Sequence, residues 1–267
     1  ESPQLYNAKN VFDFKVSELS AENFTMNKDS LIIDQAKFSK PQLTVTSTNK
    51  KTVKENPKEV NLKIGIKNLD LTQGSVLVQN QNKVRTAAIE NFRLNLNDIV
   101  FDKNTVKEKI PFAFSTHNVE LDNIYFLTDP LQAVSVKKIS SDNSDIFISN
   151  VEYKALGKST TRDLYNFKTD KIEILKNQSK FVGQQFRLNL QAINIYKPQI
   201  QIISAANKKK TEKKKNGAAP DILGKIGAIN MIDGRFVQNS GGKEKLKVGK
   251  FEMKLNNITT DKNQIQQ

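Results

Sequence analysis

Few residues in this chain have the types and spacing that chemistry requires. His117 is the single histidine, and the sequence contains no cysteine. One histidine without cysteine does not supply a typical zinc site, and no Ser-His-Asp arrangement is recognisable. His117 lies between Thr116 and Asn118, on what the alternation indicates is the polar phase of a strand. We therefore interpret His117 as a solvated side chain rather than a catalytic one.

A second candidate is Asp142-Asn143-Ser144-Asp145, which resembles the start of a calcium-binding loop. It lacks the Gly and the distal Glu of the full motif, so it predicts a plain turn. No phosphate-binding or dinucleotide-binding fingerprint is present. The sequence therefore predicts a protein that is not an enzyme, with no catalytic residue, no metal site and no cofactor.

The chain is organised around the stretch Phe92–Asp102, F-R-L-N-L-N-D-I-V-F-D. Its first half alternates strictly between apolar and polar residues, which predicts a strand with one apolar face. Residues Phe186–Leu190 read F-R-L-N-L again, and Phe251–Asp261 keep the apolar positions, the Asn-Ile step and the closing Asp. A recurring half-apolar strand indicates a repeat protein.

A short apolar signature extends the repeat over the whole chain, with units of about 50 residues. The expected units begin near Phe14, Ile64, Phe114, Phe167 and Gly224. We predict one continuous repeat domain over residues 1–267, as part of a longer chain.

Two details refine this repeat. The segments Lys40-Pro41-Gln42-Leu43 and Lys197-Pro198-Gln199-Ile200 match closely, so the first and fourth units resemble each other more than their neighbours. Gly74 and Gly234 occupy the same place in their units, where a turn or a bulge is expected.

Helical periodicity is weak, with single turns conceivable only near 129–136 and 220–225. We predict an all-β fold: an elongated, curved antiparallel sheet of about five repeats with an apolar concave face. An apolar face must be covered. Three arrangements satisfy this requirement: a β-sandwich, a closed barrel, or an open sheet whose apolar face lines a groove. The β-sandwich is the main alternative.

The formal net charge of +14 favours anionic partners such as lipid headgroups or nucleic acid. Much of the excess lies in two Lys-rich stretches, 49–59 and 207–216, which we expect to be solvated loops outside the sheet. The phenylalanines occupy the apolar phase of strands instead of accompanying the lysines. Nucleic-acid binding is therefore disfavoured, because single-strand binders combine basic grooves with exposed aromatic rings.

The repeat resembles those of AsmA-like proteins, which are envelope proteins of Gram-negative bacteria similar to chorein-type bridge proteins. The resemblance is carried by Ile66–Val76 with Phe92–Asp102, and by Ile226–Phe236 with Phe251–Asp261. It implies a β-sheet groove that carries phospholipid or other acyl-chain lipid between membranes. It also implies a periplasmic location, other envelope proteins as partners, and a membrane anchor outside this chain.

In this interpretation the Lys-rich loops can touch a membrane surface. The groove would be lined by apolar residues that share the phase of the alternating strands: Leu69, Leu71, Phe92, Leu94, Leu96, Val119, Leu121, Phe186, Leu188, Leu190, Phe251, Met253 and Leu255. Two alternatives stay open. If the apolar face is a sandwich core, the chain is a structural or adhesive envelope module. If the net positive charge carries the function, the chain is a basic nucleic-acid-binding protein.

Overall fold

The computed structural model describes residues 10–48, 62–107, 112–182, 185–205 and 223–259. These residues form strands throughout, apart from turns and one short 3₁₀ turn, Thr105–Lys107. The strands are β1 (Asn10–Lys15), β2 (Glu18–Asn27), β3 (Ser30–Ser39), β4 (Gln42–Ser47), β5 (Lys63–Asn80), β6 (Arg85–Phe101), β7 (Thr116–Asp129), β8 (Gln132–Asp142), β9 (Asp145–Ala155), β10 (Leu164–Leu175), β11 (Lys180–Val182), β12 (Gln185–Tyr196), β13 (Gln199–Ser204), β14 (Leu223–Ser240) and β15 (Lys243–Thr259).

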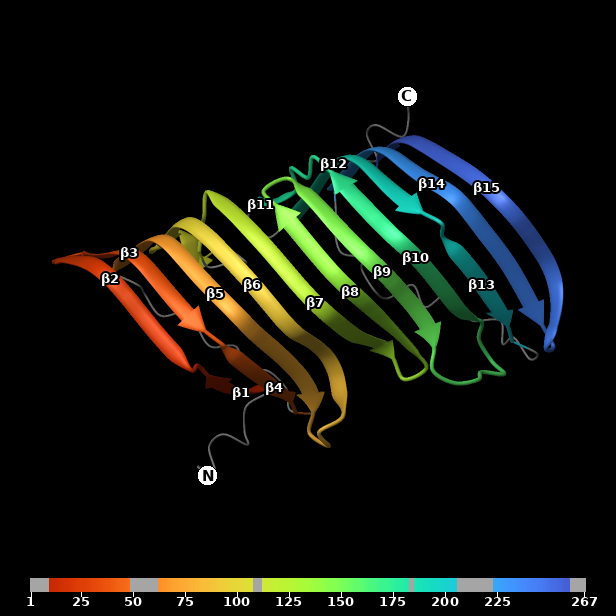
Figure 1. The fold of residues 1–267 in the computed structure, drawn as a ribbon, viewed down its shortest axis with the longest axis horizontal. Helices are drawn as coiled ribbons and strands as arrows, with labels where there is room; N and C mark the ends of the chain where they lie inside the picture. Colours follow the sequence, from red (N-terminus) through yellow and green to blue (C-terminus); the bar gives the residue numbers. More distant parts are fainter. Residues whose placement is uncertain (1–9, 49–61, 108–111, 183–184, 206–222, 260–267) are drawn as a thin grey trace. The chain divides into compact units, whose positions relative to one another are not determined.

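All of these strands belong to one 15-stranded sheet, in which sequential strands are mostly neighbours (Figure 1). The predicted all-β class is confirmed. Within the described residues no second sheet is present, so the β-sandwich alternative is wrong for this part of the chain.

The prediction of purely antiparallel pairing is wrong at four places. β5 pairs parallel with β3 and β4, and β14 pairs parallel with β12 and β13. Parallel neighbours need a connection of about a dozen residues or more. The Lys-rich stretches occupy these two connections, between β4 and β5 and between β13 and β14; they lie outside the described residues.

The chain divides into two compact units, residues 1–125 with 140–143 and residues 126–139 with 144–267. Each unit contains the same arrangement of strands, which we call the duplicated module. It consists of β1–β6 in the first unit and of β10 with β12–β15 in the second. Of the remaining strands, β7, β8 and β9 form a meander between the two copies in sequence, and the short β11 pairs with β12.

The strand registers establish the equivalence of the two copies. In the first copy Leu19 pairs with Phe38 and Phe38 with Leu71. In the second copy Ile172 pairs with Ile195 and Ile195 with Met231. The two consecutive strands β1 and β2 thus correspond together to the single continuous strand β10. The predicted likeness of the first and fourth units is confirmed.

The repeated Lys-Pro pairs interrupt a strand without detaching it from its neighbour. Lys40 and Lys197 have positive φ angles of 51° and 53°. The Lys40 amide donates to the Thr72 carbonyl at 2.8 Å, and the Lys197 amide donates to the Ile232 carbonyl at 2.7 Å. The prolines that follow lack an N–H, but their carbonyls accept from the partner strand. Each proline stands immediately before a strand, Pro41 before β4 and Pro198 before β13.

Gly74 and Gly234 lie at bulges inside long continuous strands, so the bulge was the correct expectation and the turn was not. The ring of Phe92 covers Gly74, and a Cβ there would lie 2.2 Å from the ring carbon Cζ. Phe251 covers Gly234 in the same way. Gly241 and Gly242 form the hairpin turn that connects β14 to β15, with positive φ angles of 59° and 75°.

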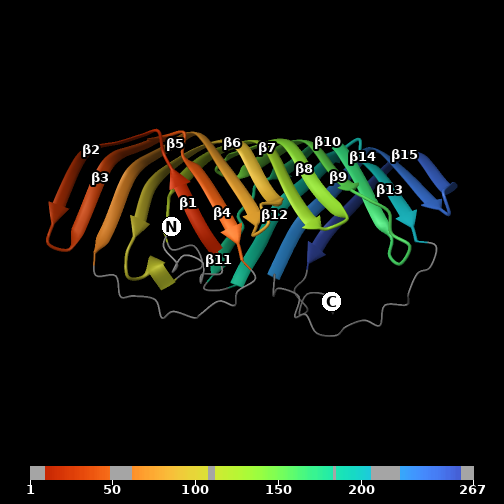
Figure 2. The ribbon, with the colours of Figure 1, turned by 90° about the horizontal axis from the view of Figure 1, so that it is seen from below.

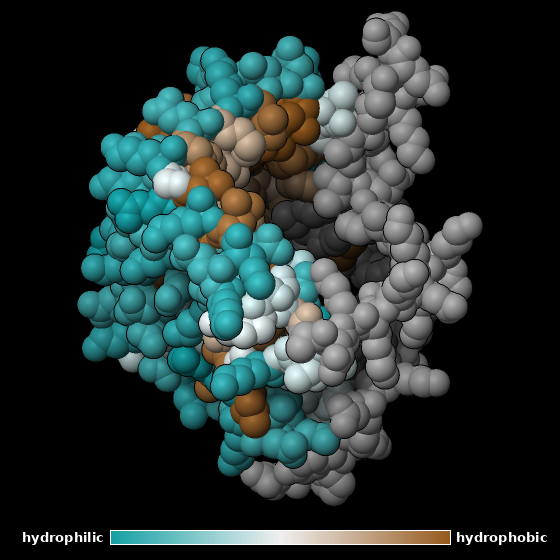
Figure 3. Space-filling view, turned by 90° about the vertical axis from the view of Figure 1, so that its right-hand side faces the viewer, coloured by the Kyte–Doolittle hydropathy of each residue, from teal (hydrophilic) through white to brown (hydrophobic). Residues whose placement is uncertain are grey.

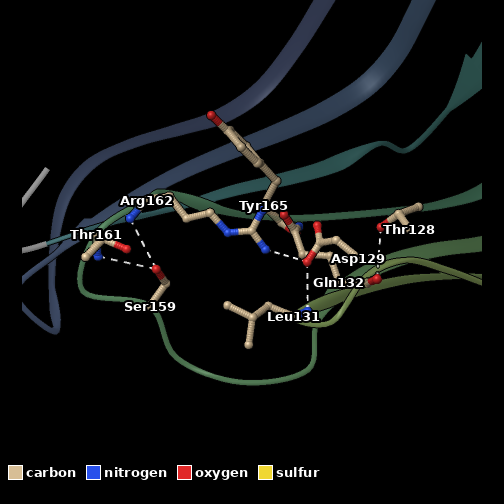
Figure 4. Close-up of polar contacts among 8 residues, drawn as sticks. All are labelled: Thr128, Asp129, Leu131, Gln132, Ser159, Thr161, Arg162 and Tyr165. Carbon is tan, nitrogen blue, oxygen red and sulfur yellow. Dashed lines mark hydrogen bonds and ion pairs between the residues drawn. The ribbon is translucent and has the colours of Figure 1, made fainter. Parts of the chain in front are cut away.

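The expected helical turn at 129–136 is wrong, because β8 begins at Gln132. A tight turn precedes it, and Asp129 stabilises that turn by accepting the Leu131 amide at 2.8 Å (Figure 4). Arg162 also pairs with Asp129 and ties the loop before β10 to this turn. In the segment near 220–225, the residues from Leu223 onward are strand, and those before it lie outside the described residues.

Candidate functional site

An apolar face runs across the second unit. Ile172, Ile195 and Met231 are direct neighbours on adjacent strands, and the same row continues to Ile148 and Met253. A parallel row runs two residues further along each strand. It consists of Ile146 on β9, Ile174 on β10, Ile193 on β12, Ile229 on β14 and Leu255 on β15.

The first unit carries the equivalent rows. Leu71 lies between Phe38 on β3 and Leu94 on β6, and Leu69 lies between Ala36 and Leu96. Because side chains alternate along β7, Val119 and Leu121 lie on one face of this strand, and Thr116 and Asp122 lie on the other. Those two residues bond to the polar face of β6, where Asn97 donates to Thr116 and Asn91 donates to Asp122. Val119 and Leu121 therefore extend the apolar face of this unit.

In each unit the opposite face of the sheet is polar and hydrogen-bonded. In the first unit Asn68 donates to Asn97 at 2.9 Å, and Asn95 donates to Asp70. These side chains alternate with the apolar rows of β5 and β6. The two faces of the sheet are therefore chemically distinct.

In the second unit the polar face is centred on Glu173. Its carboxylate pairs with Lys171 at 2.5 Å and accepts the Tyr196 hydroxyl at 2.8 Å. Lys171 and then Tyr196 hold the pKa of Glu173 below its usual range. The same carboxylate raises the pKa of Tyr196, because the hydroxyl proton is shared with it. Asn194 and Asn230 continue this chain of bonds across β12 and β14.

The apolar face is concave and incompletely covered. β14 and β15 curve along their length (Figures 1 and 2). Seen from the β15 end, apolar side chains gather in the hollow of the sheet, and hydrophilic ones cover its outer side (Figure 3). Most residues in the apolar rows are half-buried, and Met253 and Leu255 are 36% and 44% exposed. The described residues provide no second layer that buries them.

The structure groups the predicted lining residues by unit. In the first unit Leu69, Leu71, Leu94 and Leu96 are cross-strand partners, and Phe92, on β6 beside Leu94, lies over the Gly74 bulge of β5. In the second unit Phe251, Met253 and Leu255 occupy the equivalent positions on β15.

The identical letters at Phe186–Leu190 do not mark an equivalent strand. They lie in β12, which corresponds to β3 and not to β6. Leu188 pairs with Gly224, and Leu190 pairs with Ile226. Both pairs lie nearer the start of β12 than the row that contains Ile193. Leu190 is nearly buried, with 6% exposed.

Sequence reasoning omitted the isoleucines that make up most of the second unit's apolar face. Ile172, Ile174, Ile229 and Met231 belong to the apolar signature that revealed the repeat, so the signal was available. Ile193 and Ile195 are harder to recognise, because the apolar phase of β12 changes between Leu190 and Ile193.

His117 is placed differently from its expected polar phase. Its ring lies edge-on to Phe114, with centroids 5.7 Å apart, and Nε2 lies 3.2 Å from the Ser141 hydroxyl. The predicted turn at Asp142–Asp145 is confirmed, since it connects β8 to β9. Among the residues that the structure describes, no cluster of three metal-ligating side chains occurs.

A basic hollow of about 720 Å³ lies on the polar face of the second unit. Lys168, Gln199 and Arg235 form a row across β10, β13 and β14. The remaining charged lining comes from Lys154, Lys247, Lys250 and Glu152. Cations thus outnumber acids, and the Glu152 carboxylate lies 3.8 Å from the Lys154 ammonium.

The chain was compared with protein-family models, curated proteins and solved structures, and none of the three comparisons finds a match. Within the described residues no helix is long and apolar enough to cross a bilayer.

Proposed function

We propose that this chain is a non-enzymatic lipid-binding segment of a bacterial envelope lipid-transfer protein of the AsmA-like kind. Its concave apolar face would hold the acyl chains of phospholipid or a similar lipid. The observation that carries the proposal is a row of apolar side chains across five adjacent strands, Ile148 to Met253, on a sheet with no described second layer.

The chemistry of this face suits acyl chains. Sheet backbone groups are already paired between strands, so the face offers side chains such as Ile195 and Met231 without directional bonds. An acyl chain gains about 0.8 kcal/mol for each CH₂ removed from water. This interaction is insensitive to position along the face, which lets a lipid slide, and lipid movement of this kind needs no catalytic group.

The location belongs to the same proposal. By its resemblance to AsmA-like proteins, the chain would act in the periplasm of a Gram-negative bacterium. A membrane anchor would lie outside this sequence, and other envelope proteins would be its partners. The lysines at 49–59 and 207–216 would attract anionic headgroups, with about 1 kcal/mol per residue near a membrane surface.

The decisive experiment places a charge on the apolar face and a matched charge on the polar face. Leu94→Asp and Leu255→Asp change the apolar rows, whereas Arg93→Asp and Lys254→Asp alter the neighbouring residues on the opposite face. Lipid that co-purifies with each folded variant is measured by mass spectrometry.

The two apolar-face variants should keep the β-sheet circular dichroism spectrum, because Leu94 and Leu255 are not fully buried. They should lose most bound lipid, and the two controls should keep it. Equal lipid recovery from all four variants would overturn the proposal. So would the absence of lipid from the parent protein combined with unfolding of both apolar-face variants, which would make this face an ordinary core.

A second candidate function, binding of single-stranded nucleic acid, is favoured by the basic hollow around Lys168 and Arg235. Lys168→Gln/Arg235→Gln should then lower the affinity for an oligonucleotide. The log–log salt slope should fall by about 0.7 for each phosphate that the variant no longer neutralises. Lys137→Gln/Lys176→Gln is the charge-matched control, and equal slopes in both variants would remove this candidate.

A further inference from the structure

The sheet ends in two long strand edges that have no described neighbour. β15 pairs with β14 on one side only. At the other end β1 pairs with β4 and β2 pairs with β3, again on one side only. Unpaired strand edges are templates for adding another strand.

The duplicated module shows that both edges have paired counterparts elsewhere in the chain. β15 is equivalent to β6, which pairs with β5 on one side and with β7 on the other. β1 and β2 are equivalent to β10, whose second side pairs with β9. The same architecture therefore accepts a further strand at each of these edges.

Burial at equivalent positions supports this interpretation. Leu96 on β6 is 6% exposed, whereas its counterpart Leu255 on β15 is 44% exposed. At the other edge Phe14 and Leu19 are 56% and 58% exposed, and their counterparts on β10 are half-buried. Each open edge thus exposes apolar side chains. At the equivalent positions in the other copy of the duplicated module, a neighbouring strand covers them.

The two edges carry opposite charge. β15 contains five lysines and two glutamates. β1 and β2 together contain three acidic residues and one lysine. Like charges disfavour pairing of β15 with a second β15, and opposite charges favour pairing of β15 with β1 and β2.

We propose that copies of this chain associate head to tail, with the β1–β2 edge of one copy added to β15 of the next. In each copy of the duplicated module the first and last strands run in the same direction, because β2 and β6, like β10 and β15, each pair antiparallel with one of two parallel strands. Copies whose apolar faces lie on the same side therefore pair in parallel. Such a heterologous contact leaves one edge free on each end copy, so association continues beyond a dimer, into rings or open chains.

The test measures mass by analytical ultracentrifugation over a range of protein concentrations at low salt. The weight-average mass of the parent should rise with concentration beyond that of a dimer, and added salt should lower it. A parent that stays monomeric over the whole range would overturn the proposal, and this result would leave the lipid-binding proposal unaffected.

Charge reversal identifies the edges. Glu18→Lys/Glu22→Lys makes both edges basic, and Lys247→Glu/Lys254→Glu makes both acidic, so each variant should be monomeric. An equimolar mixture of the two should associate again, as should one chain that carries all four changes. Lys137→Glu/Lys176→Glu is the off-edge control and should assemble like the parent.

Assembly that neither edge variant weakens, or that the mixture does not restore, would contradict head-to-tail pairing. Circular dichroism confirms that each variant keeps its sheet. If a double variant loses its sheet, the single variants Glu22→Lys and Lys254→Glu are used instead of the double variants.

Discussion

Gly74 and Gly234 each lie beneath an aromatic ring from the neighbouring strand, and this pair of residues recurs at the same place in both units. A glycine within a strand is unfavourable by itself, because it has no side chain to pack. The ring of Phe92 or Phe251 fills that space and shields the bulge. The Gly-Phe pair is therefore a packing unit that spans two strands.

Replacing Gly74 with Val should lower the free energy of unfolding by about 1–3 kcal/mol, because the new side chain displaces the Phe92 ring. Gly249→Val is the matched control, since a Cβ at Gly249 meets no atom within 4 Å. Chemical denaturation of both variants measures the difference. If the control lost as much stability as Gly74→Val, the loss would come from strand propensity and not from displacement of the Phe92 ring.

Asp129 gives stability a pH dependence. The Arg162 guanidinium, and next the Leu131 amide, hold the pKa of Asp129 below its usual value. The folded state therefore binds this proton less readily than the unfolded chain. The stabilisation is present above the unfolded pKa and is lost as the pH falls through the folded pKa.

We expect Asp129→Asn to be less stable than the parent at neutral pH, and the difference to shrink below about pH 4. Arg162→Gln should reduce the same pH dependence, because it removes the largest cause of the pKa shift. Denaturation curves recorded between acidic and neutral pH check this. A constant difference across the whole range would contradict the assignment.

At the scale of single strands, left-handed residues mark the points where the apolar phase changes. Asp98 in β6 and Asn257 in β15 have φ angles of 51° and 53°. Both precede an isoleucine, in the Asn-Asp-Ile and Asn-Asn-Ile steps that the sequence repeats. Asn and Asp tolerate this conformation better than most residues. The Asn-Asp-Ile and Asn-Asn-Ile steps therefore encode the same backbone geometry.

This assignment predicts opposite effects for two small residues at one position. Asp98→Ala should destabilise the fold by about 1–2 kcal/mol, because a left-handed conformation is strained for alanine. Asp98→Gly should be close to neutral, since glycine adopts it freely. Thermal denaturation of both variants tests this; equal losses would mean that the Asp98 carboxylate, which accepts the Ser115 hydroxyl at 2.7 Å, is the important group.

The strands show where sequence reasoning succeeds and where it stops. Alternation identified β6 and β15, and the Lys-Pro pairs identified the likeness of units whose registers prove equivalent. Alternation says nothing about which strands are neighbours, however. The F-R-L-N-L copy at Phe186–Leu190 was therefore assigned to the wrong kind of strand, and the parallel ladders of β5 and β14 were missed, although the stretches between their partners were long enough for crossovers.

At the scale of the whole molecule, the sheet distributes stability unevenly. β5 and β14 each have neighbours along both sides, whereas β2 and β15 have them along one. Strand edges open more readily because fewer bonds must break. Hydrogen exchange should therefore be slowest in β5 and β14 and fastest in β2 and β15.

Mass spectrometry of exchanging peptides at low protein concentration measures this gradient. Raising the concentration should slow exchange in β2 and β15 selectively if these edges pair between copies. Uniform protection across all strands would contradict a sheet whose strands depend mainly on their neighbours.

The duplicated module bears on how such a protein can change over evolutionary time. Each strand needs only its two neighbours, and the two copies use the same registers although only some of their letters agree. A gene that gains or loses one copy therefore alters the span of the apolar surface without redesigning a shared interior. The number of modules therefore becomes a heritable variable that sets the extent of the apolar surface.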